Sequence, residues 1–151
     1  MKKFLGMLML ALLVTGCGGD KTTTVCKGNI DELTTNTTTI EATDDQVNTM
    51  KAVVEYDVTD YVDDQYTIDY WLSQLKSINV DYESLDGVTA NWDVDGTIIT
   101  LEVEINYDEA DLSQLSDAGV ITSTEDGEVA YISLEETVKQ QESAGLTCKE
   151  Q

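Results

Sequence analysis

Two alternating segments on either side of Asp95-Gly96 constrain the fold of this chain more than any other feature. Apolar residues occupy every second position in both: Val88, Ala90, Trp92 and Val94, then Ile99, Leu101, Val103, Ile105 and Tyr107. Alternation around Asp-Gly predicts a β-hairpin with a two-residue turn. With Val94 paired to Thr97, we expect Trp92 opposite Ile99 and every inward residue opposite another inward residue.

Three further segments also have strand character. Residues 22–30 and 34–42 are rich in Thr, and residues 43–46 form a polar turn after them. The next segment places Met50, Ala52, Val54, Tyr56 and Val58 on one face and polar residues on the other. This pattern is typical of an antiparallel sheet that is buried on one side and solvated on the other.

Helical spacing appears in three places. Ile68, Trp71, Leu72, Leu75 and Ile78 form one apolar stripe of a helix that begins between Asp60 and Thr67, with Asp60, Asp63 and Asp64 at its positive end. A short helix is predicted over 109–115, ending before Gly119, and another turn at Glu125-Asp126-Gly127. The last helix has a capping box, Ser133 with Glu136, and ends at Gly145-Leu146.

These elements predict an α+β fold, with an antiparallel β-sheet and two or three helices packed on it. The length of 151 residues allows one moderate core, so we expect a single domain over residues 25–151.

The first residues resemble an export signal. Lys2 and Lys3 precede an apolar run over 4–14, too short to span a bilayer. Val14-Thr15-Gly16-Cys17 resembles the lipobox of bacterial lipoproteins, which implies that Cys17 is acylated with diacylglycerol and that residues 1–16 are removed. We therefore expect a lipidated tether over 17–24 and a body held on the cell membrane or outer membrane, facing outside the cytoplasm.

Composition excludes many activities. The chain has 30 acidic residues, eight lysines, no arginine and no histidine, with a formal charge of −22. Without His it has no Ser-His-Asp triad and no imidazole metal ligand. Nucleic acid would repel it, because binding to phosphates requires Lys and Arg. We expect no cofactor.

Two further cysteines, Cys26 and Cys148, lie near opposite ends of the exported part. An oxidising compartment makes a disulfide between them plausible, and two free thiols are the alternative. A redox role would need closely spaced thiols, and there is no Cys-x-x-Cys in the sequence.

The lipobox, the Thr-rich segment around Cys26 and the closing Gly145-Leu146-Thr147-Cys148 resemble the YehR-like lipoproteins, a bacterial family of unknown function. The resemblance implies an α+β domain with a Cys26–Cys148 bridge. It supplies no catalytic residues.

Residues 91–102 match the spacing of an EF-hand calcium loop, with Asn91, Asp93, Asp95 and Glu102 as ligands and Gly96 at the turn. The flanks alternate with period two where an EF-hand needs helices. In a hairpin, Glu102 lies opposite Thr89, too far from Asp95 to complete a calcium shell. We therefore expect no metal site and keep these four residues as the alternative.

Aromatic residues crowd the long helix. Tyr61, Tyr66, Tyr70 and Trp71 cannot all be buried on one stripe, and exposed Tyr and Trp side chains often bind partners. The alternative is that they cover the edge of the core.

The sequence thus predicts a membrane-anchored extracytoplasmic lipoprotein that acts as a non-catalytic binding module of the cell envelope. Its partners would be the membrane, through the N-terminal lipid, and an unidentified envelope protein or small ligand. The alternatives are a divalent-cation-binding module and a small carboxylate-based hydrolase.

Overall fold

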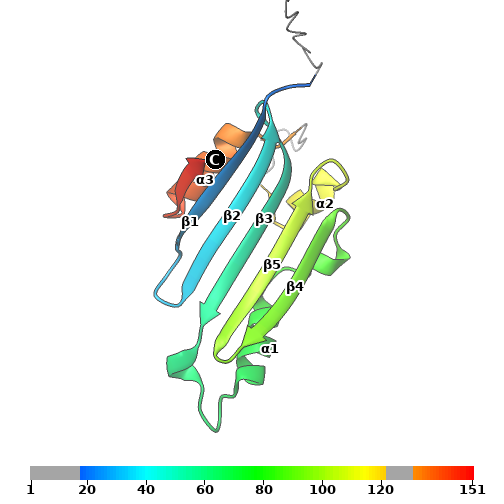
Figure 1. Cartoon of the computed structure of the whole chain (residues 1–151). Coiled ribbons are helices and arrows are strands. Elements are labelled where there is room, and N and C mark those ends of the chain that lie inside the picture. Colours follow the sequence, from blue (N-terminus) through cyan, green and yellow to red (C-terminus); the bar gives the residue numbers. More distant parts are fainter. Residues whose placement is uncertain (1–17, 122–130) are drawn as a thin grey trace, which may run out of the picture.

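The protein is built around one long antiparallel sheet, as the computed structural model in Figure 1 shows. The structure describes residues 18–121 and 131–151. The sheet has six strands in the order β4-β5-β3-β2-β1-β6. Their bounds are β1 (Lys21–Asn29), β2 (Thr34–Thr43), β3 (Gln46–Asp57), β4 (Val88–Asp95), β5 (Ile98–Asn106) and β6 (Thr147–Glu150).

Helices lie on one face of the sheet, behind the strands in the view of Figure 1. In the described residues they are α1 (Ile68–Ile78), α2 (Leu112–Asp117) and α3 (Leu134–Ser143), with short 3-10 helices η1 (Thr59–Tyr61) and η2 (Tyr82–Ser84). The expected α+β fold, an antiparallel sheet with two or three helices, is confirmed. The predicted turn at Glu125-Asp126-Gly127 lies outside the described residues.

The two faces of the sheet differ because side chains alternate along each strand. At the centre, Met50, Ala52, Val54 and Tyr56 of β3 stand opposite Ile105, Val103, Leu101 and Ile99 of β5 on the helix-bearing face. The intervening positions are mostly polar, for example Lys51 opposite Glu104 and Glu55 opposite Thr100, although Val53 lies on this face as well. Across the described part of the chain, no helix covers this polar face.

The core divides into two clusters under different helices. One joins Cys26, Ile40, Ala42, Val47 and Leu146 with side chains of α3. The other joins Val88, Leu101, Val103, Ile105 and Leu115, the last from α2. Met50 and Tyr107 contact both clusters, so these two residues connect the halves of the core.

The β4–β5 hairpin forms as predicted, but its register differs from the prediction by two residues. Asp95 pairs with Ile98 and Trp92 faces Leu101, so the turn consists of Gly96 and Thr97. Gly96 has a φ of 63°, and Thr97 does not share this positive φ. A turn with Gly at its first central position fits type II′, whereas a turn at Asp95-Gly96 would have needed positive φ at Asp95 as well. A register shift of two residues leaves the same side chains on the inner face of the sheet, so each inward residue still pairs with another inward residue, as predicted.

The predicted helix signals are mostly confirmed. The helix predicted over 109–115 is observed as α2, three residues later, because Asp111 caps it by accepting from the N–H groups of Ser113 and Gln114 at 2.9 and 3.2 Å. After α3, Gly145 has a φ of 94°, and Leu146 N–H donates to the carbonyl of Gln141 at 3.1 Å. Together with the bond from Gly145 N–H to Glu142, this is a Schellman motif.

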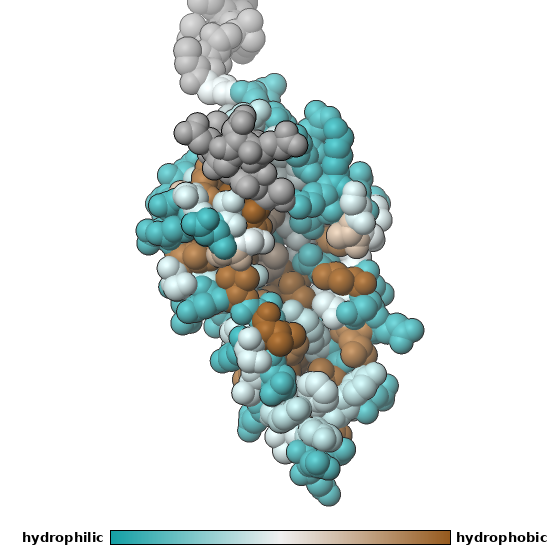
Figure 2. All heavy atoms as spheres, turned by 180° about the vertical axis from the view of Figure 1, so that it is seen from behind, coloured by the Kyte–Doolittle hydropathy of each residue, from teal (hydrophilic) through white to brown (hydrophobic). Residues whose placement is uncertain are grey.

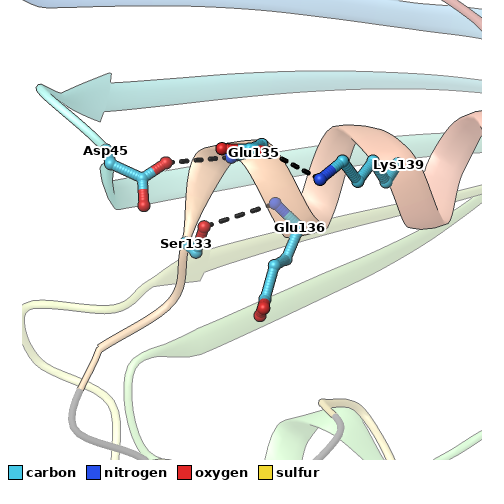
Figure 3. A network of polar contacts seen from close by, with 5 residues as sticks. All are labelled: Asp45, Ser133, Glu135, Glu136 and Lys139. Carbon is cyan, nitrogen blue, oxygen red and sulfur yellow. Dashed lines mark hydrogen bonds and ion pairs between the residues drawn. The ribbon is translucent and has the colours of Figure 1, made fainter.

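The first turn of α3 differs from the predicted capping box. Ser133 Oγ accepts from Glu136 N–H at 3.3 Å, but the Glu136 carboxylate points away from Ser133 (Figure 3). Asp45, in the turn between β2 and β3, supplies a second cap instead: its carboxylate accepts from Glu135 N–H at 3.0 Å and its carbonyl from Leu134 N–H at 2.7 Å. Glu135 also pairs with Lys139 in the same helix (Figure 3). The helix is therefore fixed to the sheet at the point where it begins.

The structure joins Cys26 and Cys148 in a disulfide across the directly paired strands β1 and β6. The predicted bridge is thus present. Cys26 is fully buried and belongs to the first core cluster. The bridge holds the short edge strand β6, and through it the end of α3, to the sheet.

Candidate functional site

The aromatic residues singled out in the sequence come together around the start of α1. The ring centroids of Tyr66 and Tyr70 are 5.1 Å apart, and those of Tyr70 and Trp71 are 5.4 Å apart. Trp71 also contacts Tyr61 and Tyr66, with centroids 6.0 and 6.4 Å away. These are separations of rings in direct contact, so the four side chains form one continuous surface, which we call the aromatic surface.

The aromatic surface remains largely exposed to solvent. Tyr61, Tyr66 and Tyr70 keep 48, 40 and 40% of their surface exposed, and Trp71 is half-buried at the centre. Trp71 Nε1 donates to the carbonyl oxygen of Tyr61 at 3.0 Å, which joins η1 to α1. The rings are therefore held in place by one another and by the backbone, and they are not absorbed into the core.

Local hydrogen bonds explain why the chain takes this shape before α1. Asp63 Oδ1 accepts from the N–H groups of Gln65 and Tyr66, at 2.8 and 2.6 Å, and so closes the turn that carries Tyr66. Thr67 caps α1 and accepts from Tyr70 N–H at 3.4 Å. The acidic cluster Asp60, Asp63 and Asp64 therefore precedes the helix, and Thr67, which lies next to the predicted cluster, takes the capping position.

α1 itself is peripheral. None of its eleven residues, all of them described, is buried, and Ile78 keeps 76% of its surface exposed. Figure 2 shows the helix-bearing face, with apolar residues reaching the surface along its middle and pale residues of intermediate hydropathy gathered at the lower end, where α1 lies. The aromatic surface thus belongs to an open end of the molecule.

The residues of the calcium-loop alternative are arranged as strands. Asn91, Asp93 and Asp95 lie along the polar face of β4, and Glu102 stands opposite Asn91. The earlier expectation of Thr89 opposite Glu102 was wrong, because of the register difference described above. Asp95 pairs with Ile98, four residues before Glu102, a distance of roughly 13 Å along the strand. One ion with ligands at about 2.4 Å cannot be reached by both carboxylates.

Glu102 instead forms an ion pair with Lys51, with Oε1 and Nζ 2.8 Å apart. This contact raises the pKa of Lys51, chiefly through the hydrogen bond from its ammonium to Glu102. Among the described residues, no group of three or more Cys, Asp or Glu is arranged to hold a metal ion.

A polar cavity of about 440 Å³ lies at the end of the sheet where the described chain begins. Sequence reasoning missed it, because it depends on a β-bulge: Glu41 pairs with Thr49 but Ala42 pairs with Val47, which leaves Asn48 as the extra residue. Asn48 accepts from Thr43 Oγ1 at 2.8 Å and donates to Asp108 at 3.4 Å. Since these polar groups already bond to one another, the cavity is a weaker candidate than the aromatic surface. Its lining residues are Lys21, Thr22, Thr23, Glu41, Ala42, Thr43, Asn48 and Asp108.

The start of the chain bears on the predicted lipid anchor. Cys17 lies outside the described residues. The expected tether over 17–24 is too long, because β1 begins at Lys21. Asp20 already bonds to the β2–β3 turn: its N–H donates to Asp44 Oδ1 at 3.0 Å, and Asp44 N–H donates to its carbonyl at 2.8 Å. Tertiary contacts thus order residues that look like a linker in the sequence.

Comparison with known proteins identifies the family. Residues 23–147 match DUF1307, a family described as a protein of unknown function. The chain belongs to this family. The YehR-like resemblance is confirmed by a solved structure: the NMR structure of the Escherichia coli YehR protein matches with a TM-score of 0.64 and 16% identity, over 87% of this chain and 92% of that chain.

A second NMR structure, of a protein from Streptococcus pneumoniae TIGR4, matches with a TM-score of 0.55 and 17% identity, over 99% of this chain and 98% of that chain. At these identities the likeness shows a shared fold. No curated protein matches the chain significantly. Within residues 18–121 and 131–151, no helix is long and apolar enough to cross a membrane.

Proposed function

We propose that this protein is a lipid-anchored, non-catalytic binding module on the outer side of a cell membrane, and that it binds its partner through the aromatic surface. The partner is an envelope protein or a small ligand presented there. The observation that carries the proposal is the position of the aromatic surface, on η1 and α1, at the opposite end of the sheet from the point where the described residues begin (Figure 1).

The length of the sheet gives this separation a scale. β3 has twelve residues and runs from Gln46, beside the turn that holds Asp20, to Asp57, just before η1. At about 3.3 Å per residue, the strand is roughly 36 Å long. An anchor at Cys17 would therefore lie at one end of the molecule, and Tyr61, Tyr66 and Tyr70 would face away from the membrane.

The short free segment supports the same orientation. If Cys17 carries the lipid, Gly18 and Gly19 separate it from Asp20, whose backbone is bonded to Asp44. Three peptide links span at most about 11 Å, so the β2–β3 end would lie against the bilayer. Its excess of carboxylates would be repelled by anionic lipid, so we expect the acyl chains alone to hold it there.

The anchor is tested by membrane fractionation and mass spectrometry of the wild type and of Cys17→Ser. We expect the wild type in the membrane fraction with fatty acyl chains attached, and the variant in the soluble fraction. Thr22→Ser is the matched control, because it changes the same region and leaves the thiol. Equal partitioning of wild type and Cys17→Ser, or a wild type without acyl chains, would contradict the anchor.

The binding role is tested by placing a photocrosslinking residue at Tyr70 in intact cells and, as a control, at Asp93 on the polar face of the sheet. We expect a discrete crosslinked product from position 70 and none from position 93. The same products from both positions, or none from position 70, would remove the aromatic surface from the proposal.

A further inference from the structure

The charge around the aromatic surface indicates what kind of partner it fits. Between residues 60 and 71 the chain carries four aspartates, Asp60, Asp63, Asp64 and Asp69, and no lysine. All four are exposed, as are the three tyrosines beside them. The electron-rich faces of Tyr and Trp attract cations, and the carboxylates add to this attraction. An anionic partner would be repelled, and a purely apolar one would have to cover unpaired charges.

The ring geometry separates a polypeptide from a small cation. The ring pairs have centroids 5.1 to 6.4 Å apart and interplanar angles of 49 to 80°, so the rings touch edge to face or at a tilt. The rings already fill the space between them, so no ammonium ion fits between two rings in contact, and a cation must approach an outer ring face, within about 6 Å of its centroid. Cations must therefore lie on the outside of the surface, which suits side chains that are supplied together by a partner.

We propose that the aromatic surface binds a basic polypeptide segment, with Arg or Lys side chains stacked over Tyr66 and Tyr70 and paired with Asp60 and Asp64. This inference rests on the proposed function, because it names the partner class of the same site. Arg suits the site best, since its planar guanidinium stacks on a ring while its N–H groups donate to a carboxylate. The rings supply the specific contacts with the peptide, and the negative charge of the whole chain supplies a long-range attraction for it.

The test uses the purified full chain in a neutral maltoside detergent, which keeps it in solution whether or not it carries a lipid. A fluorescent decapeptide of alternating Arg and Ser is titrated, and affinity is read from anisotropy. Tyr66→Leu with Tyr70→Leu keeps a large apolar side chain at both positions but removes the two π faces. We expect this pair to weaken binding about fivefold, and Tyr66→Phe with Tyr70→Phe to stay within about twofold of wild type.

Charge is tested by a matched pair of variants. Asp60→Asn with Asp64→Asn removes two charges at the aromatic surface, and Glu109→Gln with Glu150→Gln removes two exposed charges near the opposite end of the sheet. We expect several-fold weaker binding for the first and less than about twofold for the second. Asn106, just before Glu109, pairs with Thr49, which lies eight residues or roughly 26 Å along β3 from Asp57, well beyond the Debye length of about 8 Å at physiological salt. Circular dichroism confirms that each variant is folded.

Three results would overturn the inference: no measurable binding by wild type, a Leu variant that binds as well as wild type, or equal losses from the two charge variants. Displacement of the peptide by millimolar tetramethylammonium would also overturn it, in favour of a small cation. Since this experiment requires neither a lipid nor a membrane, its failure leaves the anchoring test unaffected, and a failed anchor leaves this result standing.

Discussion

The two longer helices, α3 and α1, are attached to the same sheet in different ways. α3 begins at a double cap made by Ser133 and Asp45, ends in a Schellman motif at Gly145, and leads into β6, which a disulfide joins to β1. α1 is capped at its start by Thr67 alone and at its end by Asn79, and it has no buried residue and an exposed cluster of rings at its start. The end of the molecule where the described residues begin is thus held by caps and a disulfide, whereas the end that carries α1 keeps its side chains exposed and available for contact.

The largest expected effect comes from removing the disulfide on the α3 side. Cys26→Ala with Cys148→Ala opens a loop with a sequence separation of 122 residues, and the free energy of unfolding should fall by about 2 to 5 kcal/mol. Urea denaturation measures the loss, and hydrogen exchange locates it. Protection should be lost in β6 and α3 more than in α1; an even loss over both helices would contradict the comparison.

The connection between the two core clusters gives the next effect. Tyr107→Ala should cost about 3 to 5 kcal/mol, because the ring contacts both clusters. Tyr107→Phe should cost less than about 1 kcal/mol in urea denaturation, since its hydroxyl donates to Met50 Sδ at a long 3.9 Å. A larger loss in the free energy of unfolding for Tyr107→Phe would indicate that the hydroxyl stabilises the fold more than its long hydrogen bond to Met50 suggests.

The same ring predicts a pH dependence. Burial raises the pKa of Tyr107 to about 12, above its ordinary value near 10. The folded state therefore holds the proton more tightly, so this stability is complete below pH 10 and is lost as the pH rises towards 12. Urea denaturation from pH 9 to 11.5 should show a steeper loss for wild type than for Tyr107→Phe. Parallel curves would contradict the buried position of the phenol.

The cap from Asp45 should have a smaller effect. The N–H of Glu135, followed by the hydroxyl of Ser133, lowers the pKa of the Asp45 carboxyl. The stabilisation is therefore present above the ordinary Asp pKa and is lost as the pH falls through the lowered one. Asp45→Ala should cost about 1 kcal/mol at pH 7 in urea denaturation, and less in acid. Glu136→Gln removes one charge from the same turn and is the control, with a change below about 0.5 kcal/mol.

The smallest effect is expected at α1. Ile78→Ala should change the free energy of unfolding by less than about 0.5 kcal/mol, because three quarters of the Ile78 surface is already exposed. Hydrogen exchange should show faster opening in α1 than in α3. A loss near 2 kcal/mol from Ile78→Ala would mean that α1 is packed more firmly than its exposure indicates.

Local patterns predicted the elements because their causes lie within a few residues. Alternation predicted β3, β4 and β5, and Gly119 and Gly145 correctly ended α2 and α3, since a left-handed residue after a helix is a local requirement. The aromatic surface was also foreseeable from Tyr61, Tyr66, Tyr70 and Trp71. Only Tyr70 and Trp71 lie within α1, so helical spacing did not predict the contact among all four rings. That contact depends on the turn closed by Asp63, which presents Tyr66, and on η1, which brings Tyr61 to Trp71.

Two of the remaining differences involve partners far apart in the chain, and two concern the exact pairing of neighbouring strands. Asp45 supplies the second cap of α3 that was expected from Glu136, although Asp45 lies ninety positions before the Glu135 N–H that it accepts from. Asp20, which the sequence assigned to a tether, donates its N–H to Asp44 and belongs to the folded structure. The register of the β4–β5 hairpin differs from the prediction by two residues because Gly96 is the turn residue with a positive φ. The bulge at Asn48 creates a cavity that no sequence pattern predicted.

By itself, therefore, the sequence determined which segments are strands and helices, which face of each is apolar, and the strongly negative charge of the chain. Only the tertiary structure decided the strand register, the second cap of α3, the contacts that fix Asp20, and which aromatic rings stay exposed. The physical reason is range: backbone preferences and side-chain periodicity act over one or two turns, but caps, bulges and burial depend on which distant segments meet.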